Sequence, residues 1–187
     1  MPELELATER LWLRRPKERD LPCLEQLFCD PAMMLYLGEV WTRTKVAEAL
    51  HEWRDAWGVD NRWYGVLVRR DTGEVIGTAG LTENTLEDEA GLELSWFVLP
   101  CQQGNGFAGE ITRELLRFAF TDLGKERVVA ETHPDNPASN RVLERAGFCC
   151  LGERKHHYDY LPGFDTQVLW ELTRESRLPD PDVPAAT

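Results

Sequence analysis

The sequence predicts a single α+β domain in which a mixed β-sheet carries helices on both faces. A strand is followed by two amphipathic helices and then by an antiparallel meander. Beyond the meander, one strand–helix–strand unit requires a parallel pair of strands, and a short helix and two closing strands complete the order. The 187 residues suffice for one compact domain and are too few for two.

The first half of the chain begins with an alternating strand over residues 10–14. Leucines at helical spacing predict a helix over residues 18–29. A second helix is expected over residues 45–57, where Thr44 can cap the start and Gly58 suits the end. The meander then comprises strands 63–69, 74–81 and 91–99.

The second half begins with a long amphipathic helix, expected over residues 104–123. Its apolar side chains fall on one face, and Glu110 belongs to the face predicted to be outward. The remaining elements are a strand at 127–132, a helix at 137–146 and strands at 149–158 and 167–173, which makes seven strands in all. The domain is expected to span residues 1–175, with an extended or disordered proline-rich tail at 176–187.

Composition excludes several classes of function. A formal net charge of −12 opposes binding to nucleic acid, which requires clustered Lys and Arg. Five cysteines at irregular positions form neither a disulfide framework nor a zinc site, and the adjacent His156 and His157 lack a third ligand, so we expect no metal. The apolar runs are strand-length, which predicts a cytoplasmic protein that does not enter a membrane.

A glycine-rich segment, Gln103-Gly104-Asn105-Gly106-Phe107-Ala108, lies between a strand and the long helix. A helix start leaves backbone N–H groups unpaired and carries a partial positive charge. Glycines let a phosphate approach these N–H groups closely. The segment is therefore suited to a pyrophosphate, although a glycine-rich turn without a ligand is the simpler alternative.

The same glycines also match a dinucleotide-binding fingerprint. Gly104, Gly106 and Gly109 have the required spacing, and Glu131 follows where a ribose-binding acid is expected. However, the segment follows an antiparallel meander, and only one crossover unit surrounds it. A dinucleotide fold needs several parallel strands, so an oxidoreductase is the weaker hypothesis.

Two motifs resemble one known family. Residues 92–100 and 103–110 look like motif A of the GNAT superfamily of N-acetyltransferases, (Q/R)-x-x-G-x-(G/A), which Gln103, Gly106 and Ala108 fill. Residues 136–148 resemble the N-x-x-S…E-(K/R)-x-G-F motif of the Rim-type branch, which includes ribosomal-protein N-terminal acetyltransferases. The opening Thr8-Glu9-Arg10-Leu11-Trp12-Leu13-Arg14 also matches that branch.

The resemblance implies a mostly antiparallel, seven-stranded GNAT-like sheet and acetyl-CoA as co-substrate. Trp96, Phe97 and Val98 would present backbone groups to the pantetheine arm where the sheet opens, and Asn136 would contact the coenzyme beside the thioester. The local sequence equally makes Asn136 a helix N-cap before Pro137. The implied residues around the pyrophosphate are Gln103, Gly104, Asn105, Gly106, Phe107 and Ala108.

Acetyl transfer to an amine requires a base, because an alkyl ammonium with a pKa near ~10 must lose a proton before it attacks. Glu93, on the strand beside the expected thioester, is the first candidate. A structural or solvated strand glutamate is the alternative, since the apolar Leu92 and Leu94 take the other face. His133, at a strand end, is the second candidate.

The leaving thiolate also needs a proton donor. Many GNAT enzymes use a tyrosine in the second motif, and this chain has Leu143 at the aligned position. Members of the Rim-type branch suggest Ser139 as the substitute, although a first-turn helix serine has a purely structural reading. Tyr158 and Tyr160 are further candidates.

Three hypotheses about function therefore stay open. The favoured one is an N-acetyltransferase that moves an acetyl group from acetyl-CoA to a primary amine, of a protein N-terminus or a small molecule, by direct attack in a ternary complex. The others are a dinucleotide-binding oxidoreductase and a coenzyme-binding regulatory module without activity. Trp41, Trp53 and Trp57 would line the amine site or belong to the core, and a homodimer is compatible with the sequence.

Overall fold

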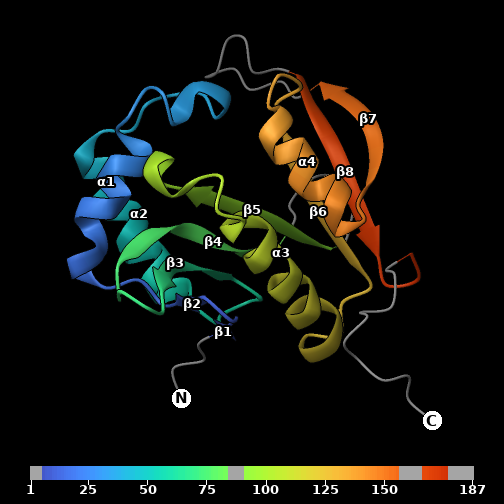
Figure 1. Ribbon diagram of the computed structural model, residues 1–187, viewed down its shortest axis with the longest axis horizontal. Coiled ribbons are helices and arrows are strands. Elements are labelled where there is room, and N and C mark those ends of the chain that lie inside the picture. The colour runs from blue at the N-terminus through green and yellow to red at the C-terminus, as the bar shows by residue number, and fades with distance from the viewer. Residues whose placement is uncertain (1–5, 84–90, 156–165, 177–187) are drawn as a thin grey trace.

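The computed structural model describes residues 6–83, 91–155 and 166–176. They form one eight-stranded sheet in the order β1-β2-β3-β4-β5-β6-β8-β7 (Figure 1). The strands are β1 Leu6–Ala7, β2 Leu11–Arg14, β3 Trp63–Arg69, β4 Val75–Glu83, β5 Leu92–Val98, β6 Arg127–Thr132, β7 Cys149–Lys155 and β8 Thr166–Thr173. Every neighbouring pair is antiparallel except β5 and β6.

The prediction of a mixed, mostly antiparallel sheet is confirmed, and the predicted count of seven strands is one too low. The additional strand is β1, whose two residues pair with β2 through Leu6 and Leu13. Two residues are too few to show a periodicity, so no local pattern indicates this strand. The predicted tail lies outside the described residues from 177 onward.

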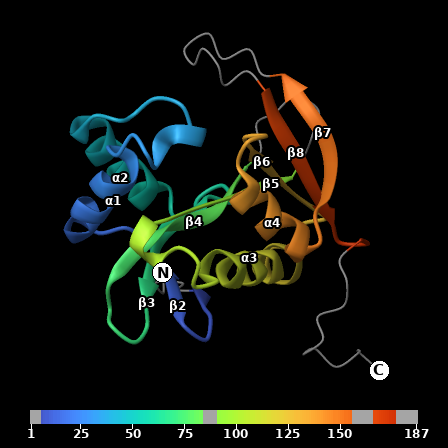
Figure 2. The same cartoon turned by 45° about the horizontal axis from the view of Figure 1, so that its top comes forward.

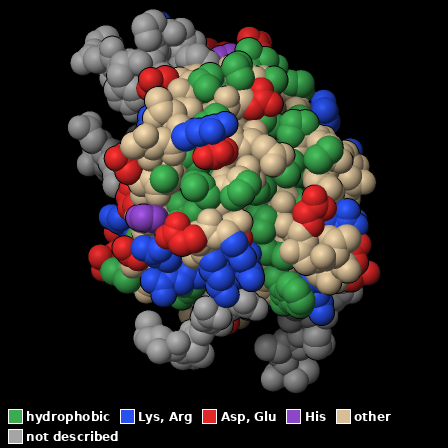
Figure 3. Space-filling view, turned by 90° about the vertical axis from the view of Figure 1, so that its left-hand side faces the viewer, with side chains coloured by type: hydrophobic (Ala, Val, Ile, Leu, Met, Phe, Trp, Pro, Cys, Tyr) green, Lys and Arg blue, Asp and Glu red, His purple; other side chains and the backbone are tan. Residues whose placement is uncertain are grey.

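The helices cover both faces of the sheet, as expected (Figures 1 and 2). Helices α1 (Leu21–Phe28) and α2 (Arg43–Ala56) pack on one face, and α3 (Phe107–Arg117) and α4 (Pro137–Ala146) pack on the other. The alternation of β3 divides the core accordingly: Leu67 contacts the cluster under α3, while Val66 and Val68 contact the cluster under α1 and α2. Acidic, basic and apolar side chains are mixed over the outer face near α1 and α2 (Figure 3).

Three helix starts differ from the sequence prediction, and the long helix ends as an α-helix at Arg117, continuing as a π-helical turn over Phe118–Asp122. Helix α2 begins at Arg43 because Thr42, two residues before Thr44, caps it: Thr42 Oγ1 accepts from the Lys45 N–H at 3.2 Å. The expected first helix starts as a 3₁₀ turn, Glu18–Asp20. Helix α3 begins at Phe107, since the preceding glycines adopt left-handed conformations that end any helix.

The sheet opens between its two parallel strands. β5 and β6 are paired only at Leu92–Val128 and Glu93–Val129, and from there they diverge. Along this edge the backbone of β5 from residue 94 to 98 faces no β6 partner in the described chain. Unpaired backbone groups need other hydrogen-bond partners, so this edge can receive an extended ligand. No helix among the described residues is long and apolar enough to span a membrane.

Candidate active site

The glycine-rich loop leads directly from β5 into α3. Gly104 and Gly106 have φ angles of 78° and 80°, a backbone conformation that residues other than glycine rarely adopt. Two side chains of the loop hydrogen-bond to nearby backbone carbonyls and stabilise its conformation. Asn105 Nδ2 donates to the Gln102 carbonyl at 3.0 Å, and Gln103 Nε2 donates to the Val98 carbonyl at 2.9 Å. A Cβ at Gly104 would meet no atom within 4 Å, so the backbone there is open to a ligand.

Gly106 is the N-cap of α3 and supplies no side chain to the first turn. The Glu110 N–H bonds to the Gly106 carbonyl at 3.0 Å, which closes the first helical hydrogen bond. The N–H groups of the residues between them start the helix without an intrahelical partner. Together with the helix dipole, these groups form a site for an anion.

The loop and the opened sheet edge meet in one cleft of about 670 Å³. It brings together ten of the predicted site residues, from β5, the loop and the start of α4. These are Trp96, Phe97, Val98, Gln103, Gly104, Gly106, Phe107, Ala108, Asn136 and Ser139. Two predicted residues are not in its lining: Asn105 faces a neighbouring hollow, and Glu93 lies further back along β5.

Asn136 and Ser139 form the cleft wall at the start of α4. Asn136 Oδ1 accepts from the Ser139 N–H at 3.1 Å, which makes Asn136 the N-cap, with Pro137 in the first turn. In the described part of the chain, neither Nδ2 of Asn136 nor Oγ of Ser139 has a hydrogen-bond partner. The capping role therefore leaves one donor from each residue available to a ligand in the cleft.

Glu93 is a largely buried carboxyl on β5, at the last position where β5 and β6 still pair. Burial, reinforced by the negative charge of Glu131 on β6, raises its pKa from 4.5 to about 7. Leu92 and Leu94 point to the other face of the strand, into the core cluster under α3, as predicted. A carboxyl that titrates near neutral pH is suited to proton transfer.

A hydrogen bond and a ring contact orient His133, the second candidate base. Its Nδ1 accepts a hydrogen bond from the Asp135 N–H at 3.1 Å. A neutral imidazole whose Nδ1 accepts carries its proton on Nε2, so the second nitrogen is a donor. Its ring lies against Tyr36 at 5.4 Å between centroids. Tyr36 belongs to the turn Met34–Tyr36 and lines the cleft, a placement that no local sequence pattern indicates.

The position aligned with the usual GNAT tyrosine is fully buried. Leu143 has no exposed surface and packs in the larger core under α3 and α4. It therefore supplies no proton donor to the cleft. Tyr158, Tyr160, His156 and His157 lie outside the described residues. Within the described ranges, no cluster of three His, Cys, Asp or Glu side chains could hold a metal ion.

Four arginines line the cleft, Arg10 and three from helices α3 and α4, and none of them was predicted as a site residue from the sequence. Arg113 on α3 and Arg141 and Arg145 on α4 all line the cleft. None of the three has an ion-pair partner among residues 6–83, 91–155 and 166–176. Arg141 and Arg145 are one helical turn apart on α4. A solvated helix face has the same spacing, so the sequence alone does not distinguish a cleft-lining face from a solvated one; the packing of α4 beside α3 does.

The predicted tryptophan lining of an amine site is not seen in this cleft. Trp41 stacks on Phe28 at 4.7 Å between ring centroids, and Trp53 meets Tyr64 edge-on at 4.7 Å. Both pack on the smaller core, and Trp57 packs on the larger one. The three tryptophans therefore belong to the core, which was the alternative interpretation.

Comparison with known proteins agrees with this architecture. Residues 10–149 match the acetyltransferase (GNAT) domain family. "Uncharacterized N-acetyltransferase YoaA" of Bacillus subtilis is 29% identical over 174 residues, which cover 87% of this chain and 93% of that protein. The chain belongs to the GNAT acetyltransferase family, as the two motifs predicted, and is an N-acetyltransferase by class.

Two solved structures share the fold with this protein. The ribosomal-protein-S5-alanine acetyltransferase of Vibrio fischeri superposes with a TM-score of 0.74 at 20% identity, over 95% of this chain and 100% of its own. The spermidine N-acetyltransferase of Vibrio cholerae, in complex with CoA and spermine, gives 0.72 at 21% identity, over 89% and 96%. The dinucleotide hypothesis is wrong: the described sheet has one parallel pair, and the family transfers acetyl groups.

Proposed function

We propose that the cleft binds acetyl-CoA in two parts and presents its thioester to a primary amine. The N–H groups of residues 104–108 would hold the pyrophosphate, and the open edge of β5, at Trp96, Phe97 and Val98, would face the amides of the pantetheine arm. On this edge the Val98 carbonyl already accepts from Gln103 Nε2. One observation carries this proposal: the anion site at the start of α3 and the unpaired edge of β5 open into the same cleft.

The three arginines of the cleft wall support a phosphorylated ligand. Arg113, Arg141 and Arg145 concentrate positive charge beside the loop in a chain whose net charge is −12. Phosphate groups attract such unpaired guanidinium groups strongly. We therefore expect these side chains to lie near the coenzyme's phosphates, which gives the cleft a counter-charge that the backbone N–H groups alone do not provide.

The chemistry follows from the groups around the cleft. The amine nitrogen attacks the thioester carbonyl carbon, the carbon–sulfur bond breaks, and the acetyl group leaves as an amide on the acceptor. The ammonium first gives one proton to Glu93, through ordered water because Glu93 does not line the cleft. As the carbon–sulfur bond breaks, the Ser139 hydroxyl gives its proton to the leaving thiolate and takes up the second proton, which the attacking nitrogen loses. Asn136 Nδ2 is positioned to donate to the coenzyme beside the thioester.

The acceptor is proposed as a primary amine that carries positive charge when it arrives. Glu93 and Glu131 place two carboxyl groups on adjacent strands beside the sheet opening, which favours a cation over an anion. A polyamine and a protein N-terminus both meet this requirement, and the two neighbouring folds are named for spermidine and for an alanine of ribosomal protein S5. Such a reaction belongs in the cytoplasm, and a homodimer remains compatible with it.

A ligand screen by thermal unfolding tests the coenzyme assignment. Acetyl-CoA at about a hundred times its dissociation constant should stabilise the fold by roughly 2.7 kcal/mol, which raises the melting temperature by several degrees for a chain of this size. NADH and NADPH at the same concentration serve as matched phosphorylated controls and should give no shift. Stabilisation by NADH with none by acetyl-CoA would show that the assignment is wrong.

A further inference from the structure

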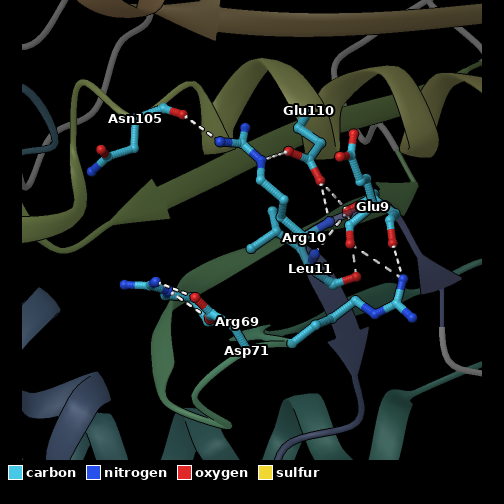
Figure 4. A network of polar contacts seen from close by, with 9 residues as sticks. Glu9, Arg10, Leu11, Arg69, Asp71, Asn105 and Glu110 are labelled. Atoms are coloured by element: carbon cyan, nitrogen blue, oxygen red, sulfur yellow. Dashed lines mark hydrogen bonds and ion pairs between the residues drawn. The ribbon is translucent and has the colours of Figure 1, made fainter.

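The turn between β1 and β2 reaches across to the first turn of α3. Thr8 Oγ1 donates to Glu110 Oε1. The Arg10 N–H donates to the same oxygen at 2.8 Å, and Arg10 Nε donates to Glu110 Oε2 at 2.6 Å (Figure 4). Glu110 was expected on the outward face of its helix, and the structure instead buries it in this contact, with 10% of its side chain exposed.

The same guanidinium group lies against the glycine-rich loop. Arg10 Nη1 donates to the Asn105 carbonyl at 3.0 Å, and the group stacks on the Phe107 ring at 4.8 Å from its centroid. Arg10 Nη2 lies 3.6 Å from the point where a Cβ at Gly106 would stand. Three contacts, with Glu110, the Asn105 carbonyl and the Phe107 ring, therefore fix this side chain beside the backbone that begins α3.

Arg10 still has unused hydrogen-bond donors. A guanidinium group has five N–H bonds, and Nε and Nη1 use one each. In the described chain Nη2 donates to no residue, and Arg10 lines the coenzyme cleft together with Gly104 and Gly106. About half of its side chain, 46%, is exposed, so the free donors are accessible from the cleft side.

Arg10 also governs the charge at the start of α3. Burial disfavours the ionised form of Glu110, but hydrogen bonds from Thr8 and Arg10 outweigh that effect and lower its pKa. Glu110 is therefore an anion in the first turn of the helix that is to receive a diphosphate. Unless it is neutralised, its charge repels that ligand, and Arg10 provides the neutralising charge.

We propose that Arg10 is a diphosphate-binding residue of this protein: Nη2 donates to the diphosphate on residues 104–108, while Nε neutralises Glu110. This inference rests on the proposed acetyl-CoA site and adds to it a side-chain donor from a strand turn that is distant in sequence. It also gives a function to the segment Thr8–Arg10, whose resemblance to the Rim-type branch implies no role for these residues.

Arg69 lies beside the same aromatic ring as Arg10 and has a structural role only. Its guanidinium also lies over the Phe107 ring, at 5.8 Å, but it binds both oxygens of Asp71 (Figure 4) and donates to Gln102 Oε1 at 3.4 Å. It does not line the coenzyme cleft. Arg69→Gln is therefore a matched control: it removes the same charge beside the same ring without removing a donor from the cleft.

The test compares binding of coenzyme A with binding of pantetheine, which has the same arm and no phosphate. Arg10→Gln should weaken coenzyme A binding about 10- to 100-fold, the range expected for a hydrogen bond to a charged group. Pantetheine binding should stay unchanged, and Arg69→Gln should alter neither. Arg10→Lys keeps the charge and loses the planar fork, so an intermediate loss is expected for coenzyme A alone.

Two results would overturn the role of Arg10. One is parental affinity for coenzyme A in a folded Arg10→Gln protein; the other is an equal loss for coenzyme A and pantetheine, which indicates a structural role. Should Arg10→Gln fail to fold, Arg10→Lys carries the same two tests. Failure of the unaltered protein to bind coenzyme A would instead refute the proposed function itself, so the two failures are distinguishable.

Discussion

Replacing Gly106 with valine is expected to abolish detectable coenzyme A binding while the domain stays folded. Gly106 has a φ of 80°, which a β-branched residue adopts only under strain. Its Cβ would stand 3.6 Å from Arg10 Nη2, and the two γ-methyl groups of valine add further bulk at this point of the loop. The phosphate would lose its close approach to the backbone. Isothermal titration with coenzyme A measures the effect.

The control for this variant is Gly124→Val. Gly124 also has a positive φ, 65°, and a Cβ there would meet no atom within 4 Å. It lies beyond the far end of α3, so the substitution imposes a similar backbone strain away from the cleft. We expect both variants to lose some thermal stability and only Gly106→Val to lose the coenzyme. A folded Gly106→Val protein with parental affinity would refute the phosphate site.

Ser139→Ala is expected to slow the chemical step by about 10²-fold with little change in acetyl-CoA affinity. The hydroxyl faces the cleft without a hydrogen-bond partner in the described chain, whereas the Ser139 N–H holds the Asn136 cap and survives the substitution. Losing the hydroxyl therefore removes the proposed proton donor to the thiolate and leaves the helix start intact. Single-turnover acetyl transfer separates this step from binding and product release.

Ser139→Thr is the matched variant, because it keeps a hydroxyl at the same position of the helix. It should retain much of the single-turnover rate that the alanine variant loses. A full rate in Ser139→Ala would mean that the serine belongs only to the helix start. The thiolate would then leave unassisted or with help from Tyr158 or Tyr160.

The sequence predicted those parts of the site whose function is local. The glycines of the loop, the strand before it and the Asn136 cap with its following proline all act on neighbours within a few residues, so their spacing is informative. The layers of the fold followed similarly from the periodicity of the strands and helices. These predictions depend on short segments alone.

What the sequence could not predict depends on contacts between distant segments. Helical periodicity placed Glu110 outward because it is polar, and nothing local shows that Arg10 approaches it from another strand. For the same reason, the sequence alone leaves open whether the Glu93 side chain is solvated or buried. Its burial beside Glu131 requires the parallel pairing of β5 with β6, which only the folded sheet displays.

Amine-dependent release of coenzyme A from acetyl-CoA, measured across pH with a library of primary amines, tests the central claim most directly. Glu93 accepts a proton only when ionised, and its pKa is raised to about 7. The transfer rate should therefore rise as pH increases through about 7 and then level off. In Glu93→Gln this rise should disappear, leaving only the later rise from the amine's own pKa near ~10.

The account predicts thiol release that requires an amine, with acetylated amine as the product in mass spectrometry and with the inflection near pH 7 carried by Glu93. An unchanged pH profile in Glu93→Gln would assign proton removal to another group. Binding of acetyl-CoA without amine-dependent release at any pH, for every amine in the library, would contradict the account and leave a coenzyme-binding module without acetyltransferase activity.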